Sequence, residues 1–166
     1  MTGEAQTVPA AGITLAVSPY RLNTFSPLSG IRSLNYLEQV LSWEEAQARE
    51  FDEAVMLNER GEIAAATMAN LFWVREGTVY TPALSTGAVA GITRSTVLKL
   101  AAADSIPVVE GIYELGDLVE ADEIFLTSAN LGVAIVTTFD FRKYAVTPES
   151  IGARLRREFR TLVQTS

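Results

Sequence analysis

The sequence contains no cysteine and no histidine. Their absence excludes disulfide frameworks, thiolate nucleophiles, zinc fingers, imidazole general bases and histidine-ligated metals. Any chemistry must therefore use lysine, carboxylate, tyrosine, serine or threonine side chains. Long apolar runs are also lacking, because none reaches the ~18 to 20 residues that a membrane span requires. Residues 1–12 lack the basic segment and continuous apolar stretch of a signal peptide. We therefore expect a cytoplasmic protein that does not enter a membrane.

Basic side chains are in the minority. The 13 lysine and arginine residues against 20 aspartate and glutamate residues give a formal net charge of −7. Such a charge repels a phosphate backbone on average, so no nucleic-acid partner is expected. Acidic clusters occur at residues 44–45, 52–53 and 120–123. Without histidine or a regular ligand spacing they are typical of solvated surface, and we expect no metal site.

The remaining composition suits one compact domain. The chain has 166 residues, of which 48% are apolar, and a chain of this size can bury one sizeable core. Residues 1–12 are mostly small or polar, and we predict a linker or a disordered N-terminus there. Residues 13–166 are predicted to form a single α/β domain.

The first elements differ in their apolar period. Alternating apolar residues over 13–17 predict a short strand that ends at Ser18-Pro19. Apolar residues at three- and four-residue steps then predict an amphipathic helix from Ser33 to about Arg49.

Short apolar runs around polar turns follow. Residues 54–57 and 63 onward predict one β-hairpin, and residues 71–74 and 78–81 predict another that ends at Pro82. Four successive strands predict an antiparallel meander.

The second half predicts helices and buried strands in alternation. A loop over residues 83–91 leads into a helix, and the last helix is predicted to have Thr147 as its N-cap and Pro148 at its first position. Between them we predict a strand at 108–109, helical turns within 114–121, and strands at 124–126 and 133–136. The whole chain therefore predicts a mixed α/β fold with antiparallel hairpins.

The first candidate site is Gly91–Thr93, where a glycine opens a helix directly after a loop. The first N–H groups of a helix lack internal partners and lie at the positive end of its dipole, so they can bind a phosphate. The alternative is a plain helix N-terminus that Thr93 caps.

Other candidates are polar residues next to apolar segments. The loop of residues 127–130 follows a buried strand and contains Ser128; it either binds a phosphate or carboxylate or satisfies its own backbone. Tyr36 either orients a ligand or packs at a helix start. Asn70 either serves a ligand or marks a strand entrance.

Five motifs occur in a fixed order: Ser-Pro-Leu-Ser-Gly-Ile-Arg-Ser-Leu-Asn-Tyr-Leu at 26–37, Ala-Asn-Leu-Phe-Trp at 69–73, Tyr-Thr-Pro at 80–82, Gly-Ile-Thr-Arg at 91–94 and Ala-Asp-Glu-Ile-Phe-Leu-Thr-Ser at 121–128. Together they resemble the C-terminal domain of class IV (fold-type IV) pyridoxal-phosphate enzymes. This family includes branched-chain and D-amino-acid aminotransferases and 4-amino-4-deoxychorismate lyases. The resemblance implies a mixed, largely antiparallel sheet or pseudo-barrel with flanking helices. It also implies pyridoxal 5'-phosphate as cofactor, an amino acid or aminodeoxychorismate as substrate, and a homodimer.

The resemblance assigns the cofactor's phosphate to two places. Ile92 and Thr93 match the helix N-terminus that holds it, and Ala129, with Ser128 next to it, is the nearest match for a hydroxyl in the second loop. Asn70 belongs to the motif beside the cofactor, and Tyr36 matches a tyrosine near the cofactor's phenolic oxygen.

Two catalytic positions depart from the family. Arg32 lies where the family has the lysine that forms a Schiff base with the cofactor, and a guanidinium stays protonated. Ala65 lies where a glutamate pairs with the pyridine nitrogen, so the electron sink loses its charge partner. The remaining lysines, Lys99 and Lys143, lie where the family keeps no Schiff base.

We therefore expect an inactive domain of this family, a pseudoenzyme without covalently bound cofactor. The family's smaller N-terminal domain of ~100 residues also has at most a dozen residues to match it here, so we expect a truncated domain. The alternative is a non-catalytic relic or engineered scaffold that self-associates or binds a small anion at Gly91–Thr93.

Overall fold

The computed structural model describes residues 12–31 and 34–165. The predicted linker therefore lies outside the described residues, except for its last residue. The strands are β1 (Ile13–Leu22), β2 (Glu53–Asn58), β3 (Ile63–Ala66), β4 (Asn70–Arg75), β5 (Thr78–Pro82), β6 (Val108–Gly111), β7 (Glu123–Ser128), β8 (Gly132–Phe139) and β9 (Arg142–Lys143). The helices are α1 (Leu37–Ala48), the short 3-10 helix η1 (Leu84–Thr86), α2 (Ile92–Ala103), α3 (Leu115–Val119) and α4 (Ile151–Thr165).

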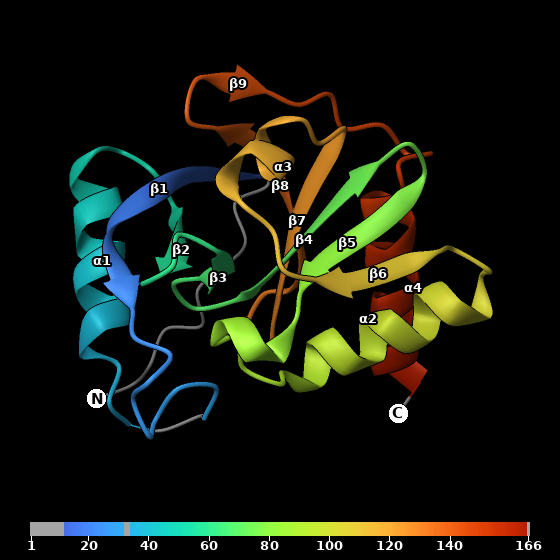
Figure 1. The fold of residues 1–166 in the computed structure, drawn as a ribbon. Coiled ribbons are helices and arrows are strands. Elements are labelled where there is room, and N and C mark those ends of the chain that lie inside the picture. The colour runs from blue at the N-terminus through green and yellow to red at the C-terminus, as the bar shows by residue number, and fades with distance from the viewer. Residues whose placement is uncertain (1–11, 32–33, 166) are drawn as a thin grey trace.

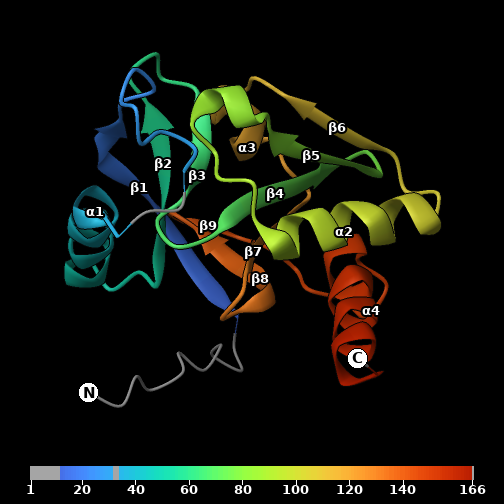
Figure 2. The same cartoon turned by 90° about the horizontal axis from the view of Figure 1, so that it is seen from below.

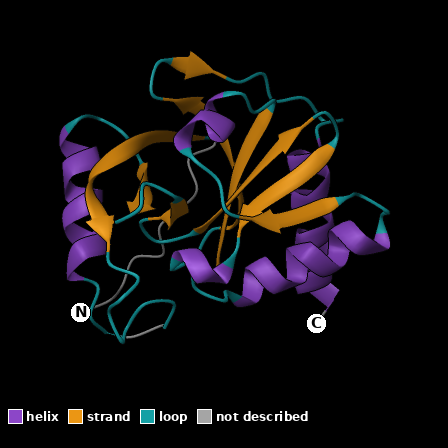
Figure 3. Ribbon diagram, in the orientation of Figure 1, coloured by secondary structure: helices purple, strands orange, loops and turns teal. Residues whose placement is uncertain are grey.

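The strands form one continuous, curled sheet in the order β3-β2-β1-β8-β7-β4-β5-β6, with β9 paired to β8 (Figure 1). β1 runs parallel to both of its neighbours, and β5 runs parallel to β6, whereas every other pairing is antiparallel. The helices α1, α2 and α4 flank the outside of the sheet, and the short α3 covers its concave side (Figure 3). The predicted fold class, a mixed and largely antiparallel sheet with flanking helices, is confirmed.

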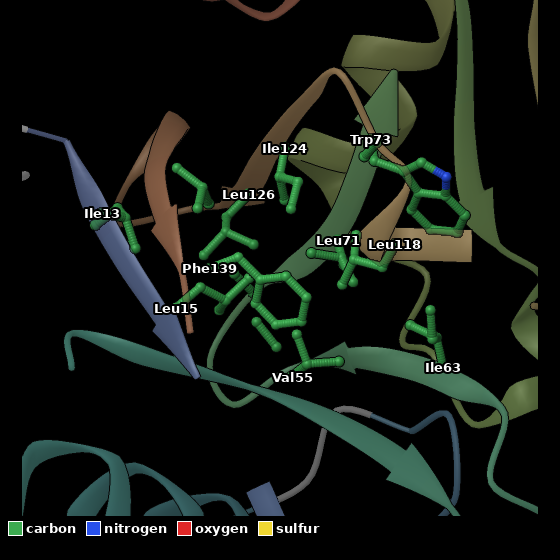
Figure 4. Close-up of a cluster of buried hydrophobic side chains, with 14 of the residues drawn as sticks. Ile13, Leu15, Val55, Ile63, Leu71, Trp73, Leu118, Ile124, Leu126 and Phe139 are labelled. Atoms are coloured by element: carbon green, nitrogen blue, oxygen red, sulfur yellow. The ribbon is translucent and has the colours of Figure 1, made fainter. Parts of the chain in front are cut away.

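Two apolar cores stabilise the sheet. The larger lies inside its curl and includes Leu15, Leu71, Trp73 and Leu126, with Leu118 of α3 packed among them (Figure 4). The smaller lies between the sheet and the helices α2 and α4, which contact each other, while α1 packs against β1 and β2 at the opposite end of the molecule (Figure 2). None of the helices in the described parts of the chain is long and apolar enough to cross a membrane.

Both predicted hairpins form, but the predicted meander is wrong. β2 pairs with β3 and β4 pairs with β5, as the local patterns indicate. However, β4 pairs with β7 on its other side, and β1, β8 and β7 lie between the two hairpins. These long, apolar strands lie at the centre of the sheet and build the large core. Their pairing depends on contacts between segments that are distant in the sequence, so a local pattern does not predict it.

The predicted end of the first strand is also wrong, because β1 continues past Pro19 to Leu22. Proline has no N–H to donate and is tolerated at irregular positions in a sheet. The pairing of β1 with β2 shifts register between Val17 and Arg21, so Pro19 falls within this irregularity.

Two helix starts differ from the prediction. α1 begins at Leu37 rather than at Ser33, and Leu34, which continued the apolar period, is fully exposed. α4 begins at Ile151 rather than after Thr147. The other predicted elements, namely α2, α3, β6, β7 and β8, are confirmed.

The start of α4 is determined by a carboxylate from a distant strand. Ser150 N–H donates to the Thr147 carbonyl at 3.2 Å, so the segment that the sequence assigned to the helix forms a turn. The Glu123 carboxylate of β7 then accepts from the N–H groups of Ile151 at 3.0 Å and Gly152 at 2.8 Å. A carboxylate at a helix N-terminus satisfies unpaired donors and opposes the positive end of the dipole.

Candidate functional site

A cavity of about 1230 Å³ lies between α1, the β3–β4 link, the N-terminal end of α2 and the loop after β7. Seven of the eight predicted site residues line it: Tyr36, Ala65, Asn70, Ile92, Thr93, Ser128 and Ala129. Segments far apart in the sequence therefore meet at one place. The eighth, Arg32, lies outside the described residues.

The N-terminus of α2 presents free donors to this cavity. The first helical hydrogen bond runs from Ser95 N–H to the Gly91 carbonyl at 3.0 Å, and no side chain caps the helix. The alternative in which Thr93 caps the helix is therefore wrong. Among the described residues, the N–H groups of Ile92 and Thr93 have no partner, and neither has the Thr93 hydroxyl, although Thr93 is only 6% exposed. These groups are suited to an anion.

Asn70 fixes the loop that leads into this helix. Its side-chain amide donates to the Val89 carbonyl at 2.8 Å, and the residue is 8% exposed. Asn70 thus lies on the cavity wall and connects β4 to the backbone two residues before Gly91.

The C-terminal end of β7 contributes one free hydroxyl. Ser128 Oγ accepts from Leu131 N–H at 3.1 Å, so Ser128 satisfies its own turn. Thr127, by contrast, is 1% exposed, and its Oγ1 has no hydrogen-bond partner within the described chain. Thr127 belongs to the predicted loop of residues 127–130, but the sequence favoured Ser128 and Ala129 as its site residues. Thr127 lies directly opposite Asn70 in the β4–β7 pairing, and this relationship is not visible in the sequence.

The remaining wall is apolar and nearly uncharged. Ala65 lies directly opposite the buried Met56 in the β2–β3 pairing, and α1 adds Val40 and Trp43. Glu38, which is exposed, is the one charged side chain among the described lining residues.

Neither lysine belongs to the described lining. Lys99 is exposed on α2 and lines a separate, smaller cavity, and Lys143 is exposed on β9. No group of three or more carboxylates that could bind a metal occurs in the part of the chain that the structure describes.

Glu53 is a buried carboxylate behind this wall, and the expectation that residues 52–53 are solvated surface is wrong for it. It is 5% exposed and accepts from Thr67 N–H at 3.0 Å, from the Thr67 hydroxyl and from Met68 N–H at 3.3 Å. Burial is the largest influence and raises the pKa of Glu53. Thr67 and Met68 line the cavity, so Glu53 positions the link between β3 and β4.

The comparisons with known proteins agree with this architecture. The sequence profile of the amino-transferase class IV family matches residues 3–139. The chain belongs to this family. An aminodeoxychorismate lyase of Vibrio harveyi is 39% identical over 126 residues, covering 76% of this chain and 46% of that protein. A putative branched-chain-amino-acid aminotransferase of Methanocaldococcus jannaschii is 33% identical over 153 residues, covering 90% of this chain and 52% of that protein.

Solved structures of class IV aminotransferases share the fold. The branched-chain aminotransferase of Thermoproteus uzoniensis with norvaline superimposes with a TM-score of 0.89 at 30% identity, covering 98% of this chain and 54% of that one. The branched-chain amino acid aminotransferase of Thermobaculum terrenum in its PLP form gives 0.88 at 28% identity, with 93% and 52% covered. This class IV chain thus spans about half the length of these relatives. The predicted resemblance is confirmed, and the family depends on pyridoxal phosphate.

The described lining fits one part of that cofactor and not the rest. The unpaired N–H groups of Ile92 and Thr93 and the free Thr127 hydroxyl suit a phosphate. An amine to bind the aldehyde and a carboxylate at position 65 to bind the pyridine nitrogen are both missing from the described lining.

Proposed function

We propose that this chain is a class IV aminotransferase domain that binds a phosphate ester non-covalently and catalyses neither amino transfer nor lyase chemistry. The observation that carries the proposal is the composition of the cavity wall. Free donors from α2 and Thr127 face it, but its described residues include no lysine, and Ala65 replaces a carboxylate. The cytoplasmic location expected from the sequence stays part of this proposal.

The missing groups are those that the chemistry needs. When bound in catalytic relatives, the cofactor supplies an electron sink for a carbanion. That role requires a lysine amine that loses its proton and a charge partner for the pyridine nitrogen. The sequence has arginine at position 32, whose guanidinium does not deprotonate in proteins. Turnover of amino acids or aminodeoxychorismate, the classes that the relatives' names indicate, is therefore expected to be absent.

Covalent trapping tests this proposal. The protein is incubated with pyridoxal phosphate, reduced with borohydride, digested, and searched for labelled peptides by mass spectrometry. We expect saturable, phosphate-competed binding before reduction and no stoichiometric label after it. A stoichiometric label at Lys99 or Lys143, or turnover by the unmodified chain, would contradict the proposal.

Restoring the missing groups provides the complementary test. Arg32→Lys combined with Ala65→Glu is expected to produce one labelled site, at position 32. Arg32→Gln with Ala65→Glu is the matched control, because it removes the guanidinium without supplying an amine. If the control is labelled as strongly as the lysine variant, position 32 is not the tethering position.

A second candidate function is self-association, which the exposed apolar side chains near the cavity favour. Ile31, Leu37 and Ile92 line the cavity yet are at least half exposed, and Phe25 and Leu34 extend the same segment. Apolar patches of this kind drive association, and we propose a homodimer. Sedimentation equilibrium should give a mass above one chain, and Leu34→Glu should lower it. A mass of 18.0 kDa at high concentration would contradict the homodimer.

A further inference from the structure

A buried cation lies in the first turn of α2. Arg94 is the third residue of this helix and is 5% exposed. The helix dipole is positive at an N-terminus, so this end of a helix favours anions and disfavours cations. The first turn of α2 also contains no acidic residue that could offset the guanidinium. Arg94 therefore adds positive charge to a helix end that is already positive.

Two neighbouring strands hold the guanidinium in place. Arg94 Nη2 donates to the Pro82 carbonyl of β5 at 3.1 Å and lies 2.5 Å from the Glu110 carboxylate of β6. Arg94 Nε is buried and has no hydrogen-bond partner among the described residues. Arg94 lines the smaller cavity that Lys99 also lines, and it is absent from the described wall of the larger one. It can therefore act on an anion in the larger cavity through its charge but not by contact.

Glu110 cancels the charge of Arg94 only in part. The Arg94 side chain is 6% exposed, whereas the Glu110 side chain is 46% exposed. Water screens the more exposed member of such a pair more strongly. Arg94 also follows directly after Ile92 and Thr93, whose N–H groups are free, whereas Glu110 lies on a neighbouring strand. The pair thus leaves a positive potential at the N-terminal end of α2.

The other side of the same turn faces the larger cavity with unused donors. Thr93 lines this cavity, is 6% exposed, and makes no hydrogen bond with its hydroxyl inside the described chain. Buried polar groups normally have partners, so the turn combines unsatisfied donors with uncancelled positive charge. Donors can bind the oxygens of any oxyanion, but the potential distinguishes anions by their charge.

From these observations we propose that Arg94 is a specificity-determining residue through which the site selects doubly charged oxyanions over singly charged ones of the same shape. The preferred ligand class is the dianionic phosphate monoester, and the disfavoured class is the sulfate monoester. The inference rests on the proposed phosphate binding and adds the charge of the ligand to it.

Two small esters that differ in charge test the selection directly. Methyl phosphate and methyl sulfate both carry one methyl group on a tetrahedral oxyanion with three terminal oxygens. At about pH 8 the phosphate ester has two negative charges, because its second pKa is about 6, and the sulfate ester has one. Calorimetric titration of the unmodified chain is expected to show tighter binding of methyl phosphate, on the order of tenfold. Equal or tighter binding of methyl sulfate would overturn the inference.

Arg94→Met removes the charge and keeps a long side chain. Because Coulomb energy is proportional to the charge of the ligand, we expect methyl phosphate to lose about tenfold in affinity and methyl sulfate only about threefold. A merely structural role of Arg94 would misplace the turn and weaken both esters equally, and that result would contradict the proposal. Arg94→Lys keeps the charge and should retain most of the preference for methyl phosphate.

A matched control removes a positive charge elsewhere. Arg75, at the end of β4, pairs with Glu120 at 2.9 Å, and both side chains are at least 40% exposed. Arg75→Met changes the net charge by the same amount as Arg94→Met and should leave the ratio of the two affinities unchanged. If Arg75→Met lowers this ratio as much as Arg94→Met does, the selection comes from net charge and not from Arg94.

Glu110→Gln gives a readout that does not depend on the folding of an Arg94 variant. The change affects a half-exposed side chain and leaves the guanidinium without its counter-charge. We expect the preference for methyl phosphate over methyl sulfate to rise, by about threefold. An unchanged or smaller preference would show that the Arg94–Glu110 pair does not set the selection.

The two proposals fail in different ways. Covalent trapping of pyridoxal phosphate would overturn the proposed function and leave the charge selection intact, because neither methyl ester has an aldehyde. A preference for methyl phosphate that survives both Arg94→Met and Glu110→Gln would overturn the role of Arg94 alone. If inorganic phosphate and both esters fail to bind at millimolar concentration, the anion site itself is wrong and both proposals fall.

Discussion

The side-chain oxygen of Asn70 occupies the space in which a Cβ atom at position 91 would lie. The same side chain donates to the Val89 carbonyl at 2.8 Å. Strand β4 therefore sets both the path of the loop and the identity of the residue at the start of α2. The N-terminal end of α2 therefore depends on a contact between two residues that are distant in the sequence.

Gly91→Ala is expected to displace Asn70 and to misplace the first turn of α2. Overpacking at a tight contact costs about 1–3 kcal/mol in the free energy of unfolding, and we expect phosphate affinity to fall as well. Urea denaturation and phosphate titration measure the two effects. Gly116→Ala is the matched control, because a Cβ at Gly116 meets nothing within 4 Å. Since Gly116 lies within α3, the substitution should leave phosphate affinity unchanged and should not lower the unfolding free energy. Equal effects of the two substitutions would refute the role of Asn70.

Removing the Glu53 carboxylate is expected to loosen the β3–β4 link. Glu53→Ala leaves the N–H and hydroxyl of Thr67 without their acceptor, at a cost of about 2 kcal/mol. Hydrogen exchange at the amides of Thr67 and Met68 should accelerate more than exchange in α4. Uniform acceleration across the protein would show that Glu53 acts on global stability only.

The raised pKa of Glu53 predicts a pH dependence of stability. Since burial raises this pKa above its ordinary value of 4.5, the folded state holds the proton more tightly than the unfolded state does. The stabilising contribution is thus complete below pH 4.5 and is lost as the pH rises through the higher folded value. The difference in unfolding free energy between the unmodified chain and Glu53→Gln should shrink as pH rises, and a growing difference would contradict the sign.

The contact between Thr24 and Glu59 has the opposite pH dependence. The hydrogen bonds from the Thr24 hydroxyl at 2.5 Å and its N–H at 2.8 Å lower the pKa of Glu59 to about 2. Because the pKa of Glu59 is lower in the folded state, its ionised carboxylate stabilises the fold fully above the ordinary value of 4.5. This stabilisation is lost as the pH falls toward 2. Exchange at the Thr24 amide should therefore rise between about pH 5 and pH 2 beyond the intrinsic trend. Glu59→Gln should show no such rise.

Two residues compete as the cap of α4: Glu123 in the structure and Thr147 in the sequence prediction. Glu123→Gln weakens an anionic cap at Ile151 and Gly152, and we expect a loss of about 1 kcal/mol in unfolding free energy. Thr147→Ala, at the N-cap that the sequence predicts, should be nearly neutral. Thermal denaturation of both variants measures these losses in unfolding free energy. A larger loss for Thr147→Ala than for Glu123→Gln would support the helix start that the sequence predicts.

The elements that the sequence predicted correctly depend on local patterns. The hairpins β2–β3 and β4–β5 follow from period-two apolar residues around polar turns, and α2 follows from a glycine that opens an apolar helical pattern. The predicted positions at the cavity came from motifs that surround it. Their assigned roles remain predictions, although seven of the eight positions meet at one cavity.

The misassigned features all depend on partners that are remote in the chain. Pro19 is accepted in β1 because the pairing with β2 is irregular there, and α4 begins at Ile151 because Glu123 supplies its cap. Residues 52–53 have the acidic sequence of a solvated surface, but Glu53 is buried because the link between β3 and β4 packs over it and Thr67 bonds to its carboxylate.

The sequence by itself determined the secondary-structure types, the family and the lack of a lysine and a carboxylate at two positions. These properties depend on residue identity and on periods of two and 3.6 residues. Only the tertiary structure decided the strand order, the burial of Glu53 and the free hydroxyl of Thr127. Burial and hydrogen-bond satisfaction depend on which distant segments pack together, and an unpaired donor is defined only once every neighbour is in place.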